Sequence, residues 1–136
     1  MMGVAAAPAR GEEVMLRFAL PLGSPFTSGC AGTQAGTLYS NTRVEPYVAV
    51  NPTNPHNLVG VWQQDRWSNG SAQGLVTGVS FDTGVTWRIV APAFSRCAGG
   101  SYQRATDPWV TFSPNGVAYQ SAVVTTGGSL QPGSVN

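Results

Sequence analysis

The feature that most restricts the fold is an internal repeat. Residues 45–52 (Glu-Pro-Tyr-Val-Ala-Val-Asn-Pro) return as residues 107–114 (Asp-Pro-Trp-Val-Thr-Phe-Ser-Pro), at a constant offset of 62. Seven of the eight pairs are identical or chemically close. A turn and a further strand-like run follow each copy, at residues 58–62 and 117–120, and the second turn is about three residues shorter. A period of this length indicates that one supersecondary unit is used more than once.

Short apolar runs separated by turn residues make up most of the chain. Strict alternation over residues 14–20 predicts a strand, and the Gly, Ser, Thr and Pro content of residues 21–43 predicts a long loop or linker. Glycine (17) and proline (10) together make up about a fifth of the 136 residues, against an ordinary usage of roughly 12%. Further strands are expected at residues 46–50, 57–64, 74–80, 85–90, 108–112 and 116–124. This spacing predicts an antiparallel all-β architecture.

Charge and hydropathy exclude several classes of partner. All seven positive charges are arginine and the formal net charge is +1, so there is no basic face for a phosphate backbone and we expect no nucleic-acid partner. No run approaches the ~20 apolar residues of a membrane span, so we expect no membrane-spanning segment. The first 11 residues lack the apolar core of a signal peptide.

The cysteines and the single histidine narrow the chemistry further. Cys30 and Cys97 are the only thiols and His56 is the only imidazole, too scattered for a zinc site, and we expect no metal and no cofactor. The two cysteines lie in Gly/Ser-rich loops, either bridged or as unrelated small residues. A bridge closing so long a loop contributes about 4 kcal/mol and implies an oxidising compartment. His56 reads as a polar turn residue.

Residues 80–87 (Ser-Phe-Asp-Thr-Gly-Val-Thr-Trp) carry the second informative pattern. They match Ser-x-Asp-x-Gly-x-Thr-Trp at each specified position, and this resembles the Asp-box, or bacterial neuraminidase repeat, of the sialidase-like β-propellers. In physical terms the motif is a hairpin turn: the acid accepts backbone N–H bonds and the glycine supplies a positive φ. The resemblance implies a structural role, away from any active centre, for Ser80, Asp82, Gly84, Thr86 and Trp87.

The resemblance also makes the organisation explicit, since four strands per repeat are typical of propeller blades. One antiparallel blade spans residues 44–90 and a partial blade residues 107–136, after an N-terminal strand and loop in residues 1–43. The next box would fall near position 141, so residues 44–136 are expected to be an incomplete propeller of about one and a half four-stranded blades. The remaining blades would come from a longer chain or another copy, and the isolated chain would expose sheet edges and a hydrophobic face.

In such propellers the ligand lies at the end opposite the box, where the loops into strand one and between strands two and three meet. Arginine forks there bind carboxylates bidentately, and aromatic rings stack on sugars. The alternative is a set of rim ion pairs on a weakly charged surface. The candidate substrate-binding residues at that end are Arg43, Glu45, Asp65, Arg66, Trp67, Arg104 and Asp107.

Departures from the family argue against catalysis by this chain alone. Aligning the family's Phe-Arg-Ile-Pro-type motif on Pro46 puts Val44 at the arginine position, and Arg43 is one residue out of step, hence on the opposite face. Residues 71–73 contain no carboxylate where the acid aspartate would lie, and the nucleophile comes from later blades. We therefore assign no catalytic residue.

Two hypotheses follow for the whole protein. The first is the N-terminal part of a secreted or cell-surface sialidase-like glycoside hydrolase that acts on or binds glycans. The second is a non-catalytic Asp-box propeller module that binds carbohydrate or protein. We expect a glycan or glycoconjugate as the foremost partner.

Overall fold

The fold is a six-stranded antiparallel β-sheet, so the all-β prediction is confirmed. A computed structural model describes residues 23–127, and the strand predicted at residues 14–20 lies outside that range. None of the described helices is long and apolar enough to cross a membrane. The elements, with the one short 3-10 helix (η1), are β1 (Leu38–Val50), β2 (Leu58–Trp67), β3 (Ala72–Ser80), β4 (Arg88–Val90), η1 (Arg96–Ala98), β5 (Arg104–Phe112) and β6 (Ala118–Thr125).

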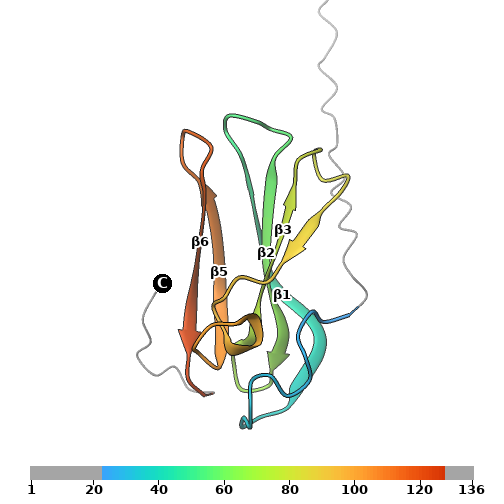
Figure 1. Ribbon diagram of the computed structural model, residues 1–136, viewed down its shortest axis with the longest axis vertical. Helices are drawn as coiled ribbons and strands as arrows, with labels where there is room; N and C mark the ends of the chain where they lie inside the picture. The colour runs from blue at the N-terminus through green and yellow to red at the C-terminus, as the bar shows by residue number, and fades with distance from the viewer. Residues whose placement is uncertain (1–22, 128–136) are drawn as a thin grey trace, which may run out of the picture.

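The strands form two groups (Figure 1). Strands β1, β2, β3 and β4 pair with one another in sequence order, and β5 and β6 form a separate hairpin. The two groups are joined in the sheet at one position only, where Ala72 of β3 pairs with Ala105 of β5. The β5–β6 hairpin therefore packs beside the four-stranded unit more than it extends it.

The internal repeat is also a repeat of backbone geometry. Val44 and Tyr47 of β1 pair with Gln63 and Val61, so two residues of β1 oppose one of β2. The same two-against-one β-bulge occurs 62 residues later in β5, between Thr106 and Trp109. The turn that follows is two residues shorter in the second copy, because Val50 pairs with Leu58 whereas Phe112 pairs with Ala118; the expected difference of three was wrong by one residue.

Most strand boundaries differ from the sequence-based expectation: β2, β3, β5 and β6 were expected at residues 57–64, 74–80, 108–112 and 116–124, and the largest differences are in β1 and β4. Strand β1 begins at Leu38, so the predicted loop 21–43 and the boundary between residues 43 and 44 both fall partly inside a strand. Pairing of Leu38 and Tyr39 with β2 overrides a composition typical of loops. Strand β4 covers only Arg88–Val90 instead of 85–90, because residues up to Trp87 are held in the turn described below.

The apolar core lies on both faces of the four-stranded unit. On the face towards β5 and β6, Val59 and Val61 pack with Val110, and Leu75 packs with Ala105, Ala122 and Val124. On the opposite face Trp62 and Val76 pack with Phe26.

A disulfide joins Cys30 to Cys97 beside that second cluster, across a sequence separation of 67. The bridge ties the segment before β1 to η1. The N-terminal loop is thereby fixed against the sheet.

Candidate functional site

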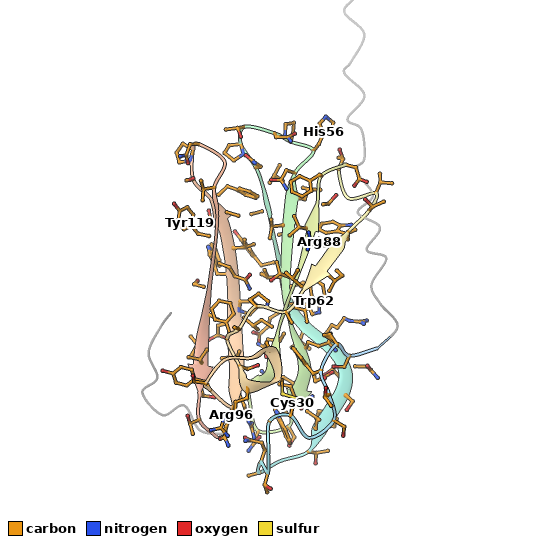
Figure 2. All side chains as sticks on the ribbon, viewed as in Figure 1. Cys30, His56, Trp62, Arg88, Arg96 and Tyr119 are labelled. Carbon is orange, nitrogen blue, oxygen red and sulfur yellow. A yellow bond between two sulfur atoms is a disulfide. The ribbon has the colours of Figure 1, made fainter. Side chains whose placement is uncertain are left out.

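The loops gather at two opposite ends of the sheet. At one end the β1–β2 turn meets the β3–β4 turn, where the Thr83 amide donates to the His56 carbonyl over 3.0 Å. At the other end the β2–β3 loop meets the entry to β1, where the Ser68 amide donates to the Thr37 carbonyl over 2.9 Å. Figure 2 shows His56 at the first end, with Cys30 and Arg96 at the other.

The turn between β3 and β4 is closed by the side chains of the Ser-x-Asp-x-Gly-x-Thr-Trp motif. Asp82 accepts the Thr86 amide over 2.8 Å and the Thr86 hydroxyl over 2.5 Å. Ser80 donates to Asp82 and accepts the Gly84 amide, both over 2.8 Å. Gly84 has φ +85°, which suits glycine, and the Trp87 indole N–H donates to the Gly84 carbonyl over 2.8 Å. All these bonds stay within the turn.

The same contacts set the charge state of Asp82. Hydrogen bonds from the Thr86 side chain and backbone, with a smaller contribution from Ser80, lower the pKa of Asp82 to about 2. Each bond favours the ionised form because it is donated to the carboxylate. Asp82 is a turn-stabilising anion at the end of the sheet away from the β2–β3 loop.

A polar pocket of about 350 Å³ lies at the β2–β3 loop end. It brings together three of the seven candidate residues: Glu45 on β1, Arg66 on β2 and Asp107 on β5. The other lining residues are Asn69, Gly70, Ser71 and Thr106. Glu45 and Asp107 occupy the two equivalent bulges, so the repeat itself delivers two carboxylates to one site.

Gln63, fully buried on β2, holds these pocket groups in place. Its amide N–H group donates to Glu45 and, over 2.9 Å, to the Thr106 hydroxyl. Its carbonyl accepts Arg66 Nη1 over 2.7 Å, and Thr106 in turn donates to Asp107 over 3.1 Å. One buried amide therefore orients both acids and the arginine, and a satisfied buried network of this kind is rigid.

Asp65 does not line the pocket, although the sequence placed it in the same cluster. Its carboxylate is buried and accepts the Asn41 amide over 2.7 Å, Gln64 over 2.8 Å and Gln73 over 2.9 Å, together with the Ser24 hydroxyl. Asp65 itself has φ +62°. It ties the segment before β1 to β2 and β3, which is a structural task.

Arg104 and Trp67 are also buried inside the protein. The Arg104 guanidinium lies 4.6 Å from the Trp67 ring centroid, and it donates to Asn69, Gly70 and Ala35 over 2.8 Å and to Gln34 over 2.9 Å. All these acceptors are neutral, and burial lowers the pKa of the guanidinium. Arg104 braces the loop that lines the pocket, and neither its fork nor the Trp67 face is open to a ligand.

Arg43 lies apart from the polar pocket. Its Nε donates to Gln64 over 3.2 Å, and it lines a second, apolar hollow of about 390 Å³ with Pro46, Val48 and Trp62. Of the four candidate cations and rings, Arg66 is thus the one that faces the polar pocket.

The pocket combines two acidic side chains with one arginine, a net charge of −1. Three of its six non-glycine lining residues, Glu45, Ser71 and Asp107, have positive φ values of 53°, 58° and 49°. Non-glycine residues adopt this conformation at a cost, and such positions cluster at functional sites. Residues 23–127 contain no group of three or more His, Cys, Asp or Glu side chains that could hold a metal ion.

Sequence reasoning missed Gln63, Ser71 and Thr106. The signal available in the sequence was Gln63, which directly follows the apolar run of β2. Its side chain points to the face of the strand opposite that of its neighbour Gln64. Polar residues buried in a central strand need partners, and of the partners of Gln63 only Thr106 depends on the packing of β5 against β2.

Comparison with known proteins adds no relative. No family model, no curated protein and no solved structure matches the chain.

Proposed function

We propose that this chain is part of a secreted sialidase-like β-propeller and binds a neutral glycan in the pocket of Glu45, Arg66 and Asp107. The observation that carries the proposal is the convergence of two repeat-equivalent acids and one arginine on a single pocket. Buried Gln63 bonds Glu45 and Arg66 directly and Asp107 through the Thr106 hydroxyl. Preorganised charged hydrogen-bonding groups are what polyhydroxylated ligands require, because each charge-assisted bond is short and strong.

Three features support the propeller assignment. Four strands pair in sequence order, the Asp82 turn joins the third to the fourth, and the polar pocket lies at the opposite end. The resemblance of residues 80–87 to the Asp-box family implies this same order. Strands β5 and β6 then correspond to the first half of a second blade.

The charge of the pocket favours a neutral sugar over a sialoside. Sialic acid carries a carboxylate, which in this family is held by a cluster of arginines. Here Arg104 is engaged by neutral acceptors, Arg43 bonds Gln64, and Arg66 alone faces the pocket beside two acids. Sugar hydroxyls that donate to Glu45 and Asp107 and accept from Arg66 match this arrangement.

The proposed activity of this chain is binding and not cleavage. The tyrosine nucleophile and its glutamate partner, which the resemblance implies for a hydrolase, would come from later blades. A secreted or cell-surface location is proposed from the disulfide between Cys30 and Cys97, because such bridges persist in oxidising compartments.

A glycan panel tests the proposal by isothermal titration calorimetry, with matched neutral and sialylated oligosaccharides. Binding to neutral glycans is expected, and Asp107→Asn should weaken it about tenfold, which corresponds to about 1.4 kcal/mol. Arg66→Gln should weaken it similarly, whereas the matched control Arg88→Gln, an exposed arginine on β4, should bind as the parent does. Preference for the sialylated glycans, or binding that survives both pocket substitutions, would overturn the proposal.

A further inference from the structure

The side chains that line the polar pocket differ in how far they are buried. Glu45 and Asp107 are exposed, whereas Ser71 is 8% and Thr106 is 6% exposed. The hydroxyls of Ser71 and Thr106 are therefore the pocket groups that the folded chain shields most from bulk water. A buried polar group raises the free energy of the folded chain unless it is hydrogen-bonded, so each of these hydroxyls needs a partner.

The Thr106 hydroxyl is already engaged by its neighbours. It accepts the Gln63 amide over 2.9 Å and donates to Asp107 over 3.1 Å. Gln63 in turn donates to Glu45 and accepts from Arg66. The single proton of the Thr106 hydroxyl is thus used inside the chain.

Ser71 differs, because its hydroxyl has no hydrogen-bond partner among residues 23–127. The backbone carbonyl of Ser71 accepts the Trp67 amide over 3.0 Å and so helps to close the β2–β3 loop, but the side chain takes no part in that closure. A serine hydroxyl can donate one hydrogen bond and accept two. The pocket therefore contains one buried hydroxyl whose bonding capacity is unused.

The backbone conformation of Ser71 does not explain the choice of serine. Ser71 has φ +58° and directly follows Gly70, which has φ +110°. Left-handed backbone costs a non-glycine residue energy, whereas glycine adopts it freely. The serine thus adds strain and makes no side-chain bond within the described residues, and strained positions of this kind cluster at ligand sites.

We infer that Ser71 is the specificity-determining residue of the pocket, and that its hydroxyl bonds one particular hydroxyl group of a neutral sugar. A sugar hydroxyl suits Ser71 because each of the two groups can both donate and accept. This role rests on the proposed glycan binding and specifies which contact recognises the sugar. A sugar that lacks the recognised hydroxyl leaves the buried Ser71 group unpaired, and a site built in this way rejects such an analogue.

NMR titration with neutral methyl hexosides tests this role. The probes are the methyl glucoside, galactoside and mannoside, each with its series of monodeoxy analogues. For a hexoside that binds, the parent chain should bind one monodeoxy analogue about tenfold more weakly than the complete sugar.

Ser71→Gly should remove that difference for this analogue and leave the losses caused by the other analogues unchanged. The complete sugar should bind Ser71→Gly about tenfold more weakly than it binds the parent, because the same contact is lost from the other side. Glycine suits the backbone at this position, so the thermal midpoint of Ser71→Gly should not fall below that of the parent. A loss of binding with an unchanged midpoint is not the result of unfolding.

Ser95→Ala is the matched control. Ser95 is fully buried and its hydroxyl has no partner within residues 23–127, but it lines neither the polar pocket nor the apolar hollow. That variant should bind each sugar as the parent does, and should show the same weakened binding of the one analogue.

The outcomes separate this role from the proposed function. Deoxy losses that are equal in the parent and in Ser71→Gly would overturn the role of Ser71, while weaker binding by Asp107→Asn and Arg66→Gln would still support glycan binding. Failure of the parent to bind any of the hexosides would also overturn the role of Ser71. Failure to bind the neutral oligosaccharides as well would overturn the proposed function itself.

Discussion

Glu45 and Asp107 occupy the same backbone position in the two copies of the repeat, 62 residues apart. Each lies in a β-bulge of its strand, with φ +53° for Glu45 and +49° for Asp107, and both side chains line one pocket. A bulge re-aims a side chain out of the regular alternation of a strand. The repeat therefore reproduces a strained conformation that turns an acid towards the pocket, and this strain is the structural cost of the site.

Replacing Glu45 by glycine should separate that cost from the function of the carboxylate. The left-handed conformation costs a non-glycine residue roughly 1–2 kcal/mol, part of which is offset by the backbone entropy of glycine. We expect the free energy of unfolding, measured by urea denaturation, to be about 1 kcal/mol higher for Glu45→Gly than for Glu45→Ala. Both variants should lose glycan affinity equally. The same Gly and Ala pair at Thr111, an exposed strand position with ordinary φ, should rank in the reverse order.

Arg104 should matter for stability and not for direct ligand contact. Arg104→Lys keeps the charge but loses the planar fork that reaches Gln34, Ala35, Asn69 and Gly70. Hydrogen bonds to charged groups are worth about 1.5–3 kcal/mol each, so a loss of at least about 2 kcal/mol in the free energy of unfolding is expected. The control Arg88→Lys, on an exposed position of β4, should change it little. A destabilisation equal to the control's would show that the buried fork is not needed.

The Cys30–Cys97 disulfide should contribute strongly to stability. It closes a loop across 67 positions, and the chain-entropy model assigns about 4 kcal/mol to a loop of that length. The Cys30→Ala, Cys97→Ala double variant is expected to unfold at a lower temperature by an amount that matches reduction of the parent chain with dithiothreitol. If reduction leaves the melting curve of the parent unchanged, the bridge does not restrain the unfolded chain as described.

Local patterns predicted the turns and the repeat, and tertiary contacts decided the rest. The bonds around Asp82 lie within seven residues of chain, and the Glu45 and Asp107 bulges recur with the sequence that specifies them. Arg104, in contrast, is buried by acceptors up to 70 residues away, at Gln34. No sequence window contains both partners, and an arginine near an aromatic residue reads equally well as a ligand fork or a buried brace.

Sheet pairing explains in the same way why residues 38–43 were expected to form a loop and Asp65 to line the pocket. Residues 38–43 carry the composition of a loop, but Leu38 and Tyr39 pair with Trp67 and Arg66 at the far end of β2. The extension of both strands also buries Asp65, which the chain order alone would place in the pocket. Burial was thus the property that the sequence could not supply.

The pH dependence of stability should identify Asp82 as the anion of its turn. Its pKa is about 2 in the folded chain against 3.8 for an ordinary aspartate. A group with a lowered folded pKa adds stability above the unfolded value, and that contribution disappears as the pH falls from about 4 through 2. Asp82→Asn should therefore melt at a lower temperature than the parent at pH 7, and the two melting temperatures should converge towards pH 2.

Thr86→Ala removes the bond with the largest effect, so NMR titration of the Asp82 carboxyl in that variant should give a pKa nearer 3.8. An unchanged titration would contradict the assignment of Thr86 as its main partner, and glycan specificity should be the same in all three chains, because the turn lies at the end of the sheet opposite the pocket.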